Sequence, residues 1–299
     1  MPARKRIRKS PKKNYKLHLI AIIFLIFGLL IIFLLKTRSW IGDAKLTLVI
    51  NNSEDLYVAV FDPVADDITT VKIPGSVEVD VSRRLGKIRL VSIWQLGKDE
   101  KLDGRLLAET ITKNFRIPVV AWADSQALGF IDKGNVIQAL ISSYKTNLTL
   151  SDKLRLFFFT LGVKEFKRTD LDLSKTSFLK AKKLADGEMG YVVTDIMPQK
   201  LIVIASDNLV SKQDLKVILT NASGDSLLSE KVGKIVESLG TKIAAIDNLK
   251  EEDFDCVVKG KDLKLDKRFA LVLGCEVSKD TSGNFDVEIK FGKKFLQRF

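Results

Sequence analysis

The chain has 299 residues, of which 46% are hydrophobic, and a formal net charge of +12 from 49 Lys and Arg against 37 Asp and Glu. Its only histidine is His18, so the rest of the chain cannot carry Ser-His-Asp catalysis or a zinc site with histidine ligands. Cysteine is limited to Cys256 and Cys275, which leaves room for one disulfide at most.

The first predicted element is a transmembrane helix over residues 17–35. Its core, residues 19–35, contains no charged side chain and is long enough to cross a bilayer. A basic tail, residues 1–16, precedes it, so the positive-inside rule predicts a cytoplasmic N-terminus and extracytoplasmic domains in the cell membrane. A cleaved signal peptide would have a shorter apolar region and small residues at the cleavage site, unlike residues 37–40. The basic tail fits anionic lipid rather than nucleic acid, so membrane lipid is a predicted partner and nucleic acid is not.

The region 44–205 alternates short β-rich runs with helical periodicity, which predicts an α/β domain. We expect strands at 45–50, 56–61, 69–73, 77–81, 88–93, 119–122, 191–193 and 200–205. We expect helices at 103–114, 125–130, 135–142 and 152–167, the last with Ser151 as N-cap. The three consecutive phenylalanines Phe157–Phe159 indicate a helix buried on two sides rather than a cofactor pocket. The polar segment 206–212 is interpreted as a domain boundary.

The region 213–295 has the clearest pattern, a strand–helix–strand order that implies a right-handed crossover in a small α/β layer. We expect strands at 215–219, 242–246, 256–259 and 285–291, and helices at 227–239 and 265–273. Gly240 stands where a helix C′ glycine belongs. Cys256 and Cys275 are a disulfide candidate in an oxidising compartment, or else two buried thiols.

The order of motifs resembles the LytR-CpsA-Psr (LCP) family, with the LytR C-terminal domain that some members carry. The resemblance lies in Asp55–Pro63, Val71–Pro74, Gly86–Ile88, Phe115–Pro118 followed by Asp124, and Leu215–Gly224. It implies an α/β fold in which the transmembrane helix is followed by an LCP-like α/β sandwich domain at 44–205 and a LytR C-terminal-like domain at 213–295. It also implies glycopolymer phosphotransfer from a polyprenyl-linked carrier, with magnesium as the cofactor of an active member and no other cofactor.

The chain departs from the family pattern where the pyrophosphate-binding arginines belong. Ser53, Gly75 and Ser76 occupy positions of the family's charged residues, and the segment 189–195 lacks both arginines expected there. Guanidinium groups hold phosphates by permanent charge and paired hydrogen bonds, which glycine cannot supply. Whether the chain is an enzyme is therefore left open.

The remaining candidates for chemistry follow from these positions. Asp55 keeps the aspartate of the family motif and is the candidate catalytic residue, with a turn or cap role as its alternative. A cationic cluster could replace the missing arginines as a pyrophosphate site, with a solvated charged loop as the alternative, and consists of Arg83, Arg84, Lys87 and Arg89.

The sequence thus predicts a membrane-anchored extracytoplasmic LCP-like protein that binds or attaches envelope glycopolymer, with weak or lost transferase activity. Its partners would be membrane lipid, polyprenyl-linked glycopolymer and envelope proteins. The alternative is a non-enzymatic envelope scaffold that docks partners through its C-terminal domain.

Overall fold

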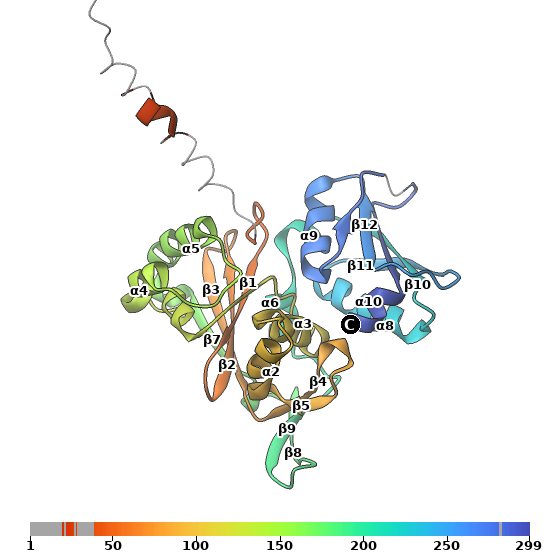
Figure 1. Cartoon of the computed structure of the whole chain (residues 1–299), viewed down its shortest axis with the longest axis horizontal. Helices are drawn as coiled ribbons and strands as arrows, with labels where there is room; N and C mark the ends of the chain where they lie inside the picture. Colours follow the sequence, from red (N-terminus) through yellow and green to blue (C-terminus); the bar gives the residue numbers. More distant parts are fainter. Residues whose placement is uncertain (1–19, 21, 27, 29–38, 281–282) are drawn as a thin grey trace, which may run out of the picture. The chain divides into compact units, whose positions relative to one another are not determined.

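The computed structural model describes residues 20, 22–26, 28, 39–280 and 283–299 (Figure 1). Residues Arg38–Phe299 form one unit, separate from Met1–Thr37. Most of the predicted transmembrane segment 17–35 lies outside the described residues. Among the residues that are described, none of the helices has both the length and the apolar character needed to cross a bilayer.

The central sheet, sheet A, has five strands in the order β6-β1-β2-β3-β7. Its middle is an antiparallel meander of β1, β2 and β3, flanked by β6 parallel to β1 and β7 parallel to β3. The β2–β3 turn is closed by the Asp62 carboxylate, which accepts hydrogen bonds from the backbone N–H groups of Val64 and Ala65. The strands span β1 Leu46–Asn51, β2 Asp55–Asp62, β3 Asp67–Pro74, β6 Ala121–Ala123 and β7 Arg168–Asp172. The predicted strands 56–61 and 69–73 are confirmed and form the β2–β3 hairpin, and β7 is an addition to the predicted strands.

A smaller sheet, sheet B, has the order β5-β4-β9-β8. Its strands are β4 Val77–Asp80, β5 Lys87–Arg89, β8 Leu179–Lys183 and β9 Met189–Val193. The predicted strand 88–93 is too long, because the chain leaves β5 after Arg89 and enters helix α2 at Ile93.

Helices cover both faces of sheet A (Figure 1). Alternate residues of β1 explain why: Leu46, Leu48 and Ile50 pack on the α4–α5 side, and Val49 packs on the α2–α3 side. A continuous apolar strand is the pattern expected when both faces are buried. The α-helices of this region are α2 Ile93–Asp99, α3 Gly104–Phe115, α4 Val136–Ile141, α5 Leu150–Gly162, α6 Gln199–Ala205 and α7 Asn208–Ser211. Short 3-10 turns are η1 Ser82–Arg84, η2 Leu90–Ser92, η3 Ser125–Phe130, η4 Lys133–Asn135, η5 Glu165–Lys167 and η6 Leu173–Lys175.

Two features of α5 differ from the sequence prediction. The helix is capped by Thr149 rather than Ser151, in a capping box with Asp152, and it ends at Gly162. The three phenylalanines are not buried on two sides, because consecutive helical residues point about 100° apart. Phe159 packs against Trp40 and Phe61, whereas Phe158 is 67% exposed.

The predicted strand 200–205 is instead helix α6. Pro198 is its N-cap, and Leu201 and Ala205 are buried one helical turn apart while Ile202 and Val203 face outward. A short apolar run has no periodicity that separates a strand from a helix.

The C-terminal region forms sheet C, in the order β11-β10-β14-β12-β13. Strands β10 and β11 are parallel and joined by α8, so the predicted crossover unit is confirmed. Its elements are β10 Lys216–Ala222, α8 Ser226–Ser238, β11 Lys242–Asn248, β12 Cys256–Gly260, α9 Leu263–Leu273, β13 Glu276–Val277, β14 Val287–Gly292 and α10 Lys293–Arg298. Gly240 has φ +97, the left-handed conformation predicted for it.

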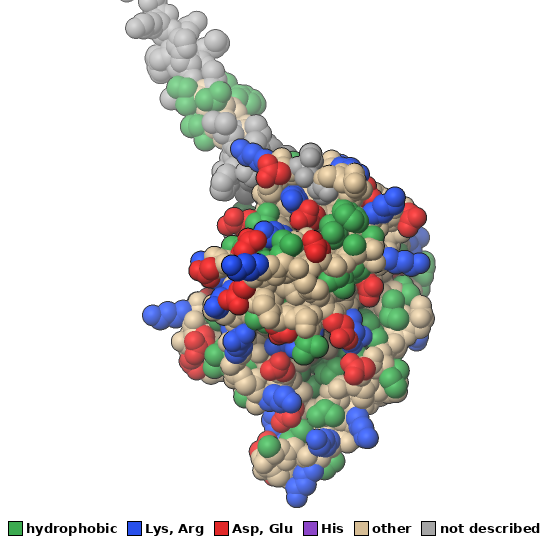
Figure 2. Space-filling model, turned by 90° about the vertical axis from the view of Figure 1, so that its right-hand side faces the viewer, with side chains coloured by type: hydrophobic (Ala, Val, Ile, Leu, Met, Phe, Trp, Pro, Cys, Tyr) green, Lys and Arg blue, Asp and Glu red, His purple; other side chains and the backbone are tan. Residues whose placement is uncertain are grey.

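Ion pairs join the acidic run of this region to its C-terminal cations. Figure 2 shows Lys and Arg side chains interspersed with Asp and Glu over the face turned to the viewer. The acidic run that follows β11 meets the cations around β14 and α10 in the pairs Glu251–Lys293, Glu252–Lys290, Asp253–Lys294 and Asp255–Arg298.

A buried contact, which we call the seam, joins three stretches of chain and consists of the ion pair Asp207–Arg268 and the backbone of Lys45. The Asp207 carboxylate lies 2.8 Å from Arg268 Nη2, which also donates to the carbonyl oxygen of Lys45 at 2.9 Å. Burial lowers the pKa of the Arg268 guanidinium from its ordinary value. The segment 206–212, which we interpreted as a polar boundary, thus contributes a fully buried side chain.

Candidate functional site

A cleft of about 480 Å³ lies between the α3–β6 part of the central region and the end of α9. The apolar part of its lining comes from both sides, with Leu102, Ala108, Val119, Val120 and Trp122 on one and Leu271, Val272 and Leu273 on the other. The polar groups of its lining include Arg105, Glu109 and Arg298. An apolar wall with a few charged groups is the usual character of a ligand site.

Helix α3 positions two of the polar groups on its exposed side. Arg105 and Glu109 are one helical turn apart, and Arg105 Nε donates to the Glu109 carboxylate at 2.8 Å. Gly104 lets α3 begin close to the wall, because a Cβ there would lie 2.5 Å from the rings of Trp94 and Trp122. The tryptophan pair therefore fixes the start of the helix that carries Arg105.

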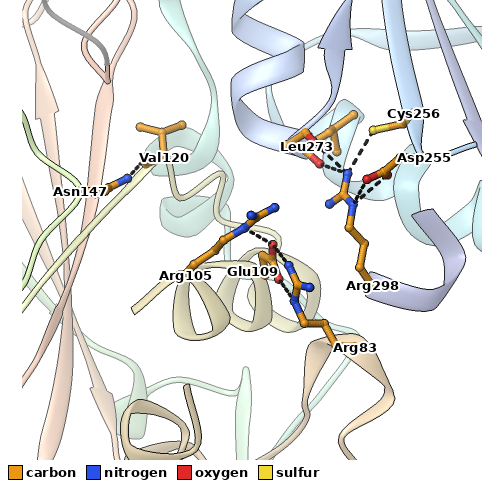
Figure 3. A network of polar contacts seen from close by, with 10 residues as sticks. Arg83, Arg105, Glu109, Val120, Asn147, Asp255, Cys256, Leu273 and Arg298 are labelled. Carbon is orange, nitrogen blue, oxygen red and sulfur yellow. Dashed lines mark hydrogen bonds and ion pairs between the residues drawn. The ribbon is translucent and has the colours of Figure 1, made fainter. Parts of the chain in front are cut away.

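The same carboxylate also binds Arg83, one of the predicted cations. Arg83 Nε and Nη2 donate to the two oxygens of Glu109 at 2.9 and 3.0 Å. Figure 3 shows Arg83 and Arg105 reaching Glu109 from two sides. Two guanidinium groups share one carboxylate, so this trio carries one net positive charge at the cleft.

The backbone of the β4–β5 turn explains the direction of Arg83. Arg83 and Arg84 both adopt the left-handed conformation, with φ of +67 and +59. This conformation is uncommon for residues other than glycine, and it changes the direction in which the side chains of the turn leave the backbone. Arg83 points to α3, and Arg84 is exposed.

Arg298 closes the opposite wall of the cleft. Its Nη2 donates to the last carbonyl oxygens of the α9 turn, those of Leu273 at 3.1 Å and Gly274 at 3.0 Å. Its Nε donates to both oxygens of Asp255, at 2.8 and 2.9 Å (Figure 3). A cation at a helix C-terminus is favourable, so Arg298 both caps α9 and places a guanidinium beside the cleft.

The disulfide candidates lie next to this arginine. Cys256 and Cys275 are joined in the structure, with S–S 1.99 Å, and Arg298 Nη2 lies 3.1 Å from Cys256 Sγ. The bond ties the start of β12 to the chain just after α9.

The other predicted site residues do not line the cleft. Asp55 lies at the start of β2 and forms an ion pair with Lys72 at 2.8 Å. The Asp55 carboxylate raises the pKa of the Lys72 ammonium by accepting its hydrogen bond. Asp55 is therefore placed as a surface ion-pair partner in sheet A.

The rest of the cationic cluster is likewise dispersed. Arg89 pairs with Asp186 at 2.8 Å across sheet B, and the hydrogen bond holds the pKa of Asp186 below its ordinary value. Arg84 and Lys87 are exposed. Of the four predicted cations, the structure brings Arg83 alone to the border of the cleft.

Among the residues that the structure describes, no group of three or more Asp, Glu, His or Cys side chains is placed to hold a metal ion. Asp55, the carboxylate that the resemblance assigns to catalysis, faces the Lys72 ammonium instead of a second carboxylate.

Comparison with known proteins gives a structural similarity only. No protein-family model matches the chain, and no curated protein is significantly similar to it. Among solved structures, Bacillus subtilis TagV is similar at 11% identity over 55% of this chain and 95% of that chain, with a TM-score of 0.39. TagT of the same organism is similar at 12% identity over 57% and 94%, with a TM-score of 0.40. A third, the LytR-CPS2A-psr family protein YwtF (TagT) with bound octaprenyl pyrophosphate lipid, is 13% identical over 55% and 88%, with a TM-score of 0.39.

The similarity is to LytR-CpsA-Psr proteins. The resemblance predicted from the sequence is thereby found again as a similarity of structure over somewhat more than half of the chain. At these identities the similarity says nothing about the residues of the cleft, whose chemistry rests on this chain's own side chains.

Proposed function

We propose that this chain is a membrane-anchored, extracytoplasmic protein that binds a lipid-linked glycopolymer precursor of the cell envelope. The ligand class is an amphiphile with a polyprenyl tail and a phosphate or pyrophosphate head. The cleft beside α3 is its binding site.

One observation carries the proposal: the cleft combines guanidinium groups with an apolar wall. Arg105 lines the cleft, uses only Nε for Glu109, and has a side chain that is 53% exposed, which leaves its outer nitrogens for a ligand. Guanidinium groups bind phosphate oxygens through paired, charge-assisted hydrogen bonds. Trp122 and the leucines of the wall offer apolar surface to a prenyl chain.

Membrane anchoring is the second part of the proposal. It rests on the chargeless run at 19–35 and the basic tail before it. An anchor would hold the cleft near lipid-linked substrates, with membrane lipid and envelope proteins as partners.

Glycopolymer transfer is not included in the proposal. A transferase needs a base or metal beside the phosphates, and Asp55 pairs with Lys72 without lining the cleft. The activity proposed is binding.

The test measures binding of octaprenyl pyrophosphate, the lipid that YwtF holds. The full chain in nanodiscs is titrated, and bound lipid is counted by native mass spectrometry. Arg105→Ala removes charge-assisted hydrogen bonds worth about 1.5–3 kcal/mol, so we expect binding to weaken roughly 10- to 100-fold.

Arg84→Ala is the matched control, because it removes an exposed arginine that does not line the cleft. We expect it to bind as the unaltered chain does. If Arg84→Ala bound the lipid more weakly and Arg105→Ala bound it as the unaltered chain does, the binding site would be the predicted cationic cluster and not the cleft. No binding by the unaltered chain would overturn the proposal and favour the scaffold interpretation.

A further inference from the structure

Helix α5 presents an apolar stripe to solvent along its whole length. The stripe consists of Leu150, Leu154, Phe158 and Leu161, which recur at helical spacing on one side. Phe158 is 67% exposed, and Leu150 and Leu161 are exposed by about half. A surface helix normally turns its polar face outward, so an outward apolar stripe marks a contact surface.

The beginning of α5 holds the chain where the folded region starts. The Asp152 carboxylate accepts hydrogen bonds from the backbone N–H groups of Ser39 and Trp40, at 3.3 and 3.4 Å. Arg155 donates to the carbonyl oxygen of Gly42 at 2.8 Å, and its guanidinium lies 4.3 Å from the Trp40 ring. Residues 39–42 are thus fixed to the first turns of the helix that carries the stripe.

Sheet register places another exposed aromatic residue at the same end of sheet A. Leu46, the first residue of β1, pairs with Phe61 beside the β2–β3 turn. Arg168, the first residue of β7, pairs with Ile68 on the other side of that turn. Phe166 immediately precedes β7 and is 78% exposed, with the Lys164 ammonium 5.8 Å from its ring.

The chain between Ser39 and the apolar segment is short. Leu35 and Ser39 are separated by the three residues 36–38, which span roughly 14 Å when fully extended. If residues 19–35 cross a bilayer, the first turn of α5 must lie within that distance of its surface.

We propose that the α5 stripe and Phe166 rest in the interface of the bilayer in which this chain is itself anchored. The inference depends on the membrane anchoring of the proposed function. Exposed aromatic and leucine side chains with an adjacent lysine are typical of interfacial helices. Ser39 also lines the cleft, so this contact would set the cleft at the level of lipid headgroups.

The test reads the depth of single labels on the full chain in vesicles. A nitrobenzoxadiazole fluorophore is attached at Leu161→Cys, and at Lys182→Cys on β8 as the matched exposed control. The native cysteines are joined to each other and take up no label. With spin-labelled lipids we expect at least a twofold stronger quenching at 161 than at 182, and a blue-shifted emission at 161.

Two further measurements separate the possible failures. Alkaline extraction shows whether the chain stays with the vesicles, and release into the supernatant would overturn the anchoring and this inference together. Retention with equal, weak quenching at both labels would overturn the interface contact alone. Phe158→Asp with Phe166→Asp, both exposed, should leave the thermal midpoint unchanged and reduce quenching at 161 to the level of the control.

Discussion

Two ion pairs with the same chemistry and the same length lie in opposite surroundings. Asp207 and Arg268 in the seam are 2.8 Å apart with side chains 0% and 1% exposed, whereas Arg89 and Asp186 on sheet B are 2.8 Å apart with 26% and 49% exposed. Solvent can replace either partner on sheet B, whereas the side chains of the seam are almost wholly buried. The comparison teaches that burial, and not distance, decides which charges hold this molecule together.

The largest expected effect comes from removing one partner of the seam. Asp207→Ala leaves Arg268 buried without its carboxylate, and we expect the free energy of unfolding to fall by about 3–5 kcal/mol. Urea unfolding followed by circular dichroism measures it. Asp186→Ala is the matched control and should leave the urea midpoint unchanged, while equal losses for both variants would contradict the comparison.

The disulfide should give the next largest effect, because it fastens the end of the helix that carries Arg268. Cys256→Ser with Cys275→Ser opens a crosslink between residues 19 apart, and we expect a loss of about 3 kcal/mol. The same unfolding experiment with and without reductant measures it. Reductant should lower the urea midpoint of the unaltered chain and leave that of the double variant unchanged.

A smaller effect is expected from Asp266, a second buried acidic or basic side chain on α9, the helix that carries Arg268. Asp266 is buried two residues from Arg268, but its Oδ1 has no hydrogen-bond partner among the described residues. Burial raises the pKa of Asp266 to about 6, with a lesser contribution from Asp262. The folded chain therefore binds this proton more tightly than the unfolded chain, so this group favours folding increasingly as the pH falls from 7 toward 4.

Asp266→Asn should remove that contribution. We expect the difference in thermal midpoint between the variant and the unaltered chain to shrink as the pH is lowered from 7.5 to 5. The sole histidine, His18, precedes the folded region, so no histidine within residues 39–299 obscures the measurement. A difference that is constant with pH would contradict the raised pKa, because Asp266 would then not change its protonation differently in the folded and unfolded chain over this range.

Elements with a strong local pattern could be predicted from the sequence. Helix α8 has apolar residues at helical spacing and Gly240 directly after its end, and α3 has the same periodicity. Strand β8 could not be predicted, because Lys180, Lys182 and Lys183 give it no apolar alternation and its pairing with β9 decides its conformation.

The cleft could be predicted only in part. Arg83 was selected from its neighbourhood in the sequence, and its position at the cleft depends on two left-handed residues in one turn. Arg105 and Arg298 lie almost two hundred residues apart and meet through the tertiary fold, so no local spacing marks them as a pair. The i,i+4 pair of Arg105 and Glu109 on a predicted helix was the available signal.

The burial of Trp40 has a mechanical consequence. Its side chain is 1% exposed and packs on Phe159, while the backbone of residues 39 and 40 is tied to Asp152. A force applied at residue 39 would be transmitted directly to α5 and the apolar core. Residues 39 and 40 therefore move as one body with α5 and sheet A, because buried packing and hydrogen bonds to Asp152 hold them there.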